Sequence, residues 1–151
     1  MSYVKQVEHT PKPDFTRSLN FLALGVFQDQ GLQPGHRAVD GALDGLLDKV
    51  IERGDFKGKK GDSLVLFTGG PLARVALVGL GETGKFTPEV ARLAAGNAVG
   101  LAIKHNQPGC ALLGFEADLP AEELTQAMVE GLILGSYRFR DYKKPERMIK
   151  S

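Results

Sequence analysis

The feature that most constrains the fold of this sequence is the stretch from Arg74 to Gly100, where an apolar run, a glycine loop and a small-residue helical pattern follow one another. The run 74–80 has the length of a strand and is nearly all apolar, which is typical of a strand buried on both faces. Thr87, Pro88 and Glu89 then form a helix start signal: a capping side chain, a proline at the first helical position and an acid in the first turn. We therefore predict a strand over 74–80 and a helix from 88 to about 104.

The same alternation of strand-like and helix-like patterns runs along the rest of the chain. Apolar runs predict strands over 19–27, 63–68 and 110–115, and apolar residues at helical spacing predict amphipathic helices over 37–53 and from about 120 to 137. Arg53 and Gly54 suit the end of the first of these helices. The runs 63–68 and 74–80 could pair as a hairpin across a loop that begins with Gly69 and Gly70. This alternation indicates a single domain of the α/β class.

Two pairs of glycines lie four residues apart inside predicted helices: Gly96 with Gly100, and Gly131 with Gly135. A glycine inside a helix costs about 0.5–1 kcal/mol relative to alanine. Small residues at this spacing allow close backbone approach, so we expect these helices to pack tightly on the sheet or on each other. Both helices carry charged residues, which argues against the alternative of a membrane dimerisation face.

Composition restricts the location and the partners of the chain. It has 151 residues with a net charge of +1, a single cysteine (Cys110), and neither a bilayer-spanning apolar run nor the apolar core of a signal peptide. We therefore expect a cytoplasmic protein that does not contact a membrane. Residues 138–151 hold six basic and two acidic residues. This segment is interpreted as a solvated linker rather than a nucleic-acid arm, because the rest of the chain offers no matching basic face.

One glycine-rich loop has the residue spacing of a nucleotide-binding motif. Gly79, Gly81 and Gly84 match Gly-x-Gly-x-x-Gly after a strand, but the helix opens only at Thr87, and Lys104 stands where a ribose-binding acid would be expected. We interpret the motif as a tight strand-to-helix loop. Anion binding by exposed amides stays open as a weaker hypothesis. Its candidates are Gly69, Gly70, Gly79, Gly81 and Gly84.

Other polar residues predict no catalytic, cofactor or metal site. Acidic side chains recur every four residues on the first predicted helix, opposite its apolar face, and are expected to be a solvated surface rather than a cation site. They are Asp40, Asp44, Asp48 and Glu52. The three histidines lack a metal-ligand spacing, and Cys110 lies in an apolar strand where a thiol is usually inert. Those histidines are His9, His36 and His105.

Several blocks together, over about residues 37–142, resemble the N-terminal domain of the leucyl aminopeptidase (cytosol aminopeptidase) family. They are Arg53–Gly61, Val75–Phe86, Ala94–Gly96, Glu130–Phe139 and Tyr142–Lys143. The resemblance implies a macro-domain-like mixed sheet flanked by helices. In that family a C-terminal catalytic domain follows, binds two divalent metals through a lysine and several carboxylates, and assembles as a hexamer. None of those catalytic or metal-binding motifs occurs in this chain.

The resemblance leads to the following expectations. Residues 1–140 form the domain, and 141–151 form a basic linker toward a catalytic domain that is absent from the chain. This chain alone is inactive, whereas its parent is a two-metal aminopeptidase that releases N-terminal amino acids from peptides. The expected partners are the parent's own catalytic domain and further copies in a hexamer. Two alternatives stay open: a stand-alone macro-like module that binds a nucleotide or another anion, and a nucleic-acid accessory domain that uses the basic tail.

Overall fold

Two apolar parallel strands form the centre of the sheet because their side chains are buried on both faces. The computed structural model describes residues 21–68, 74–105, 111–112 and 115–142. Strands β1 (Phe21–Phe27) and β3 (Arg74–Gly81) pair in parallel, and both are buried almost throughout. β2 (Ser63–Phe67) pairs antiparallel with β3, and the short β4 (Ala111–Leu112) pairs parallel with β1. The order β2-β3-β1-β4 confirms an α/β fold with a mixed sheet, and the predicted antiparallel pair is present.

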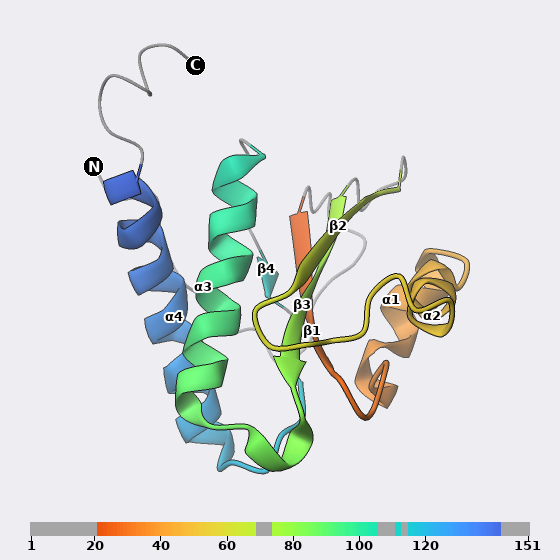
Figure 1. The fold of residues 1–151 in the computed structure, drawn as a ribbon, viewed down its shortest axis with the longest axis horizontal. Coiled ribbons are helices and arrows are strands. Elements are labelled where there is room, and N and C mark those ends of the chain that lie inside the picture. Colours follow the sequence, from red (N-terminus) through yellow and green to blue (C-terminus); the bar gives the residue numbers. More distant parts are fainter. Residues whose placement is uncertain (1–20, 69–73, 106–110, 113–114, 143–151) are drawn as a thin grey trace.

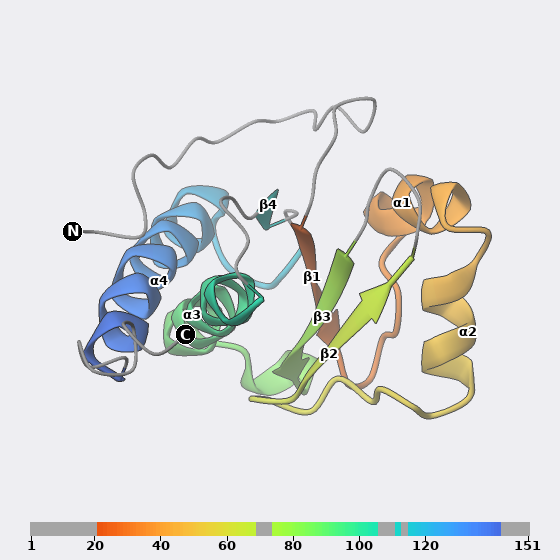
Figure 2. The same ribbon diagram turned by 90° about the horizontal axis from the view of Figure 1, so that it is seen from above.

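Helices cover the sheet on both sides (Figures 1 and 2). The 3-10 turn η1 (Pro34–His36) and helices α1 (Arg37–Ala42) and α2 (Leu46–Glu52) lie on one side. On the other side the 3-10 turn η2 (Thr83–Lys85) leads into α3 (Pro88–Lys104), and α4 (Ala121–Tyr142) lies beside α3. No helix among the described residues combines the length and the apolar character that crossing a membrane would require.

Alternate side chains of each central strand supply two separate cores. Phe21, Ala23 and Phe27 of β1 face α3 and α4, whereas Leu22, Leu24 and Val26 face α1 and α2. This is the period-2 alternation of a strand, here with apolar residues on both sides. A sheet of this kind is stable only when both faces are covered, which explains the three-layer arrangement.

The prediction of one continuous helix over 37–53 is wrong. The helix breaks between α1 and α2, where Asp44 and Gly45 adopt left-handed backbone angles of φ 57° and 75°. The amide of Gly45 donates to the carbonyl of Asp40 at 2.8 Å, which closes α1. The predicted end of the helix is confirmed, because Gly54 has φ 80° and Asp55 donates to the carbonyl of Val50 at 3.1 Å.

The placement of Asp40 on a solvated acidic stripe is also wrong. Asp40 is buried, and its Oδ1 accepts hydrogen bonds from the amides of Leu47 at 2.9 Å and Asp48 at 3.4 Å. Asp40 therefore satisfies otherwise unpaired amides in the first turn of α2, as a capping side chain does. Asp44 and Glu52 are exposed, and Asp48 lies 3.8 Å from Arg37 in an exposed ion pair that contributes little.

The start of α3 is as predicted, whereas α4 is longer than predicted. The Thr87 hydroxyl accepts from the amide of Val90 at 3.4 Å, and Pro88 is the first helical residue. α4 continues to Tyr142 rather than ending near Tyr137, because no glycine or proline interrupts residues 138–142. Of the predicted strand 110–115, β4 is described, and Cys110 lies outside the described residues.

The four-residue glycine spacing brings α3 and α4 into direct backbone contact. A Cβ atom on Gly135 would lie 2.5 Å from Gly96 Cα and 2.8 Å from Gly96 O, and one on Gly131 would overlap the Arg92 carbonyl oxygen. Such separations leave no room for a methyl group. The prediction of tight packing is confirmed, and the partner of each helix is the other helix.

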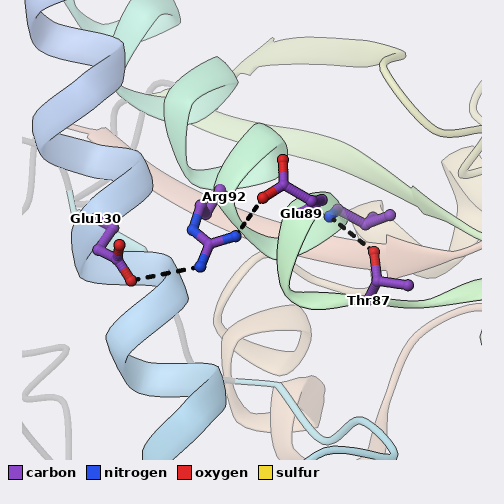
Figure 3. A network of polar contacts seen from close by, with 5 residues as sticks. Thr87, Glu89, Arg92 and Glu130 are labelled. Atoms are coloured by element: carbon purple, nitrogen blue, oxygen red, sulfur yellow. Dashed lines mark hydrogen bonds and ion pairs between the residues drawn. The ribbon is translucent and has the colours of Figure 1, made fainter.

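A polar contact joins α3 and α4 close to the Gly131 contact. Figure 3 shows the Arg92 guanidinium between Glu89 of its own helix, to which it hydrogen-bonds, and Glu130 of α4, whose carboxylate lies 3.6 Å away. Arg92 therefore contributes its backbone to the Gly131 contact and its side chain to a charge pair across the interface. The charge pair is partly exposed, so the backbone contact dominates.

Replacing Gly135 with alanine tests this contact. We expect Gly135→Ala to lower the free energy of unfolding by about 1–3 kcal/mol, because overpacking against backbone outweighs the helix-forming advantage of alanine. Gly41→Ala is the matched control, since a Cβ on this α1 glycine meets nothing within 4 Å. Urea denaturation should show the control unchanged or slightly stabilised. A Gly135→Ala protein as stable as the control would contradict close backbone packing.

Candidate functional site

The candidate site is the edge of the sheet where β1 and β3 end. These neighbouring parallel strands lead to helices on opposite faces: β1 to α1 and α2, and β3 to α3 (Figure 2). Such a topological switch point is where open α/β sheets usually hold ligands. The predicted glycine loop, 79–84, lies at this edge.

Two glycines of the loop donate their amides to backbone carbonyls of the same chain. The amide of Gly79 donates to the Asp62 carbonyl at 2.8 Å, and the amide of Gly81 donates to the Gly58 carbonyl at 2.9 Å. A Cβ on Gly79 would overlap the Lys59 carbonyl oxygen, and Gly81 has a positive φ of 77°. Glycine at these positions lets residues 58–62 lie directly against β3, and both amides are used internally.

An internal carboxylate occupies the next donors of the loop. Asp29 Oδ1 accepts from the Thr83 hydroxyl at 2.6 Å and from the Thr83 amide at 3.1 Å. Gln30 Nε2 also donates to Thr83 Oγ1 at 3.3 Å. The Thr83 side-chain hydrogen bond, followed by the Thr83 amide bond, lowers the pKa of Asp29 below its ordinary value. Asp29 thus engages the amide and hydroxyl donors of Thr83. Among the other anion candidates, Gly84 is exposed, and Gly69 and Gly70 lie outside the described residues.

A buried glutamine ties the loop after β1 to the segment before α4. Gln33 Nε2 donates to the Glu116 carbonyl at 2.7 Å, and the Glu116 amide donates to Gln33 Oε1 at 2.8 Å. Gln33 is only 5% exposed, and both bonds are part-buried. Together with the Asp29–Thr83 bonds, this pairing joins the loops of β1 and β3 and the approach to α4.

The remaining polar residues do not converge. Within the described part of the chain, no group of three or more His, Cys, Asp or Glu side chains is arranged to hold a metal ion. His36 is buried at the start of α1, His105 lies at the end of α3 beside Phe21 and Phe67, and His9 is outside the described residues. A hollow of about 290 Å³ near Phe27 and Phe56 lies just below the usual ligand-pocket range of roughly 300–1,000 Å³.

Sequence reasoning missed the bonds between Asp29 and Thr83. A usable signal was present, because each residue follows a strand that is buried on both faces. The carboxyl ends of adjacent parallel strands meet at one edge, which brings polar residues just after them together. The Gln33–Glu116 pairing joins residues 83 positions apart and had no comparable signal.

The pKa of Asp29 tests the loop-to-loop bond. Because its folded pKa is lowered, the stability that Asp29 contributes is present above its ordinary pKa of 3.8 and is lost as the pH falls through the folded value. We expect Thr83→Val to raise this pKa toward the ordinary value, since the hydroxyl donor is removed. NMR titration of the Asp29 carboxyl measures it, with Thr87→Val as a control that should leave it unchanged. An unaltered pKa in Thr83→Val would contradict the bond.

Known proteins match this chain over most of its length. Residues 23–146 match the model of the cytosol aminopeptidase family, N-terminal domain. A probable cytosol aminopeptidase of Syntrophotalea carbinolica is 36% identical over 141 residues, which cover 89% of this chain and 28% of the relative. The chain thus spans between a quarter and a third of that relative's length.

Two solved structures have a similar fold over most of this chain. A mutant of tomato leucine aminopeptidase superposes with a TM-score of 0.64 and 28% identity, over 78% of this chain and 25% of that one. The bottromycin maturation enzyme BotP, solved in complex with Mn, superposes with a TM-score of 0.55 and 25% identity, over 83% of this chain and 25% of that one. The chain therefore belongs to the cytosol aminopeptidase family, whose N-terminal domain it matches.

Proposed function

We propose that this chain is the non-catalytic N-terminal domain of a metallo-aminopeptidase that releases N-terminal amino acids from peptides. The observation that carries the proposal is the extent of the match. It covers nearly all of this chain but only 28% of the S. carbinolica relative, and the matching family model describes an N-terminal domain. The remaining part of such a protein would then catalyse the reaction.

Two divalent metal ions in the catalytic domain would polarise the peptide carbonyl and activate a water molecule. The solved neighbour BotP, described as a complex with Mn, supports a divalent metal in proteins of this type. The role of this chain is then structural. A macro-like arrangement of its layers, assembly into a hexamer and a cytoplasmic location belong to the same proposal, on the strength of the family resemblance.

The contacts at the switch point support a structural role. Asp29 holds the Thr83 donors, and the Gly79 and Gly81 amides are hydrogen-bonded to residues 58–62, so internal groups use the polar atoms that a nucleotide phosphate would need. A carboxylate at this position also repels an anion. The hypothesis of a stand-alone nucleotide-binding module therefore gains no support from the described loops.

Activity measurements on two samples test the proposal. The first is the purified 151-residue chain, and the second is the polypeptide captured from the source cells with an antibody against this domain. With Mn²⁺ and a leucyl chromogenic peptide substrate, we expect the captured polypeptide to release the chromophore and to lose this activity on chelation. The purified chain should release none under the same conditions.

Each departure from this pattern has a separate meaning. Metal-dependent turnover by the purified chain would contradict a non-catalytic role. A captured polypeptide without aminopeptidase activity would contradict the proposed parent enzyme. An unrelated aminopeptidase added to the assay mixture serves as the control for substrate and metal.

A further inference from the structure

The sheet has a free outer edge along β2. Within the described part of the chain, β2 is the last strand on its side of the sheet and pairs only with β3 (Figure 2). Such an edge presents amides and carbonyls that can pair with another strand, and native edges are often protected by lysine or proline. The run Ser63–Phe67 contains no charged residue and no proline, and Phe67 is 65% exposed. We refer to the outer side of Ser63–Phe67 as the β2 edge.

The ladder between β2 and β3 identifies the backbone groups on the β2 edge. The Gly79 amide donates to the Asp62 carbonyl, one position before the first pair of the register. Hydrogen-bonded and non-hydrogen-bonded pairs alternate along antiparallel strands, so Leu64 and Leu66 bond to β3. The amides and carbonyls of the intervening residues point instead to the β2 edge. These residues are Ser63, Val65 and Phe67.

The backbone of β2 can pair with the same strand of a second copy. Antiparallel pairing about a two-fold axis at Val65 places Val65 opposite itself and Ser63 opposite Phe67. Every residue that points to the β2 edge then lies opposite a residue that also points to it. In this register the outward amides and carbonyls of both copies therefore gain hydrogen-bond partners.

The side chains are compatible with the same register. Leu64 of one copy would lie opposite Leu66 of the other on the α1/α2 side of the sheet, where both leucines are only partly buried in a single chain. A second hollow, of about 240 Å³, lies between the loop at Phe56 and the start of β2, which leaves space beside Leu64. Just before the strand, Asp62 would lie opposite Thr68, so like charges do not face each other.

We propose that β2 pairs antiparallel with β2 of a second copy, so that two sheets join into one across a two-fold axis. A contact of this kind is closed, because it uses the β2 edge of both copies and leaves neither exposed. An extended peptide of another protein would satisfy the same backbone groups, but the fit of β2 to itself on both faces favours a second copy. The inference concerns this chain by itself and does not depend on the proposed aminopeptidase function.

Disulfide cross-linking tests the register. Leu64→Cys and Leu66→Cys are made separately in a Cys110→Ser background and are oxidised with glutathione disulfide, each alone and as a mixture. In the proposed pairing these two positions form a non-hydrogen-bonded pair with Cα atoms about 4.5 Å apart, within the range of a disulfide. Identical positions are diagonal neighbours roughly 7–8 Å apart, which is too far. We therefore expect covalent dimer to form about tenfold faster or more in the mixture than in either variant alone.

Sedimentation equilibrium measures the association without cysteine variants. We expect the 151-residue chain to form a dimer as its concentration rises. Val65→Pro removes the central outward amide but no bond to β3, and should raise the dissociation constant by about tenfold or more, because each dimer loses its central pair of hydrogen bonds. Leu134→Ser, at an exposed apolar residue of α4, is the matched control and should leave the dissociation constant unchanged. Urea denaturation verifies that both variants fold, and the cross-linking result decides if Val65→Pro does not.

The remaining outcomes are distinct. A chain that stays monomeric at every concentration would overturn the proposal, and so would cross-linking that is no faster in the mixture. A dimer that is weakened by Leu134→Ser and not by Val65→Pro would assign the contact to α4 and would also overturn it. A monomer whose β2 amide signals shift in NMR spectra when an unrelated extended peptide is added would assign the β2 edge to a peptide instead. Failure of the aminopeptidase proposal would change none of these results.

Discussion

Direct backbone contact between α3 and α4 is the constraint on which the helical layer of this domain depends. The contact requires glycine at Gly131 and Gly135, since a methyl group at either position meets the backbone of α3. It lets α4 lie beside α3 at a separation that larger residues would prevent. Leu124 and Ala127 can then complete the core that α3 shares with the sheet. The conformational cost of glycine inside a helix is offset by this packing.

At the switch point of the sheet, where α/β folds usually hold ligands, several polar groups bond to the chain itself. The polar groups exposed by parallel strands at their carboxyl ends must be satisfied by something. Here the partners come from the chain, with Asp29 bound to Thr83 and residues 58–62 bound along β3. The loops of β1 and β3 are thereby joined to one another.

Local patterns made much of the fold predictable from sequence. The strands β1 and β3, the Thr87 cap and the left-handed Gly54 each depend on residue types within a few positions, and each is confirmed. The break between α1 and α2 was not predictable in the same way. Apolar spacing continues through it, and the break depends on Asp40 turning inward to hydrogen-bond an amide seven residues ahead.

The contacts within the candidate site were harder to predict from the sequence than the fold. The motif at Gly79–Gly84 was interpreted as a tight strand-to-helix loop, with anion binding as a weaker hypothesis. The group that occupies its Thr83 donors was not predicted, because Asp29 is 54 residues from Thr83. Spacing alone does not reveal such pairings, which follow from the order of strands in the sheet. The family, by contrast, was identifiable from the order of several blocks of sequence, because that order reflects the whole domain.

If this domain is one part of a larger enzyme, as proposed, the native protein must be much larger than 151 residues. An immunoblot of the source cells with an antibody against this domain should show a band several times heavier than 16.3 kDa, since the chain spans only 28% of its S. carbinolica relative. A single band at 16.3 kDa would mean that the domain acts alone and is not part of a longer aminopeptidase.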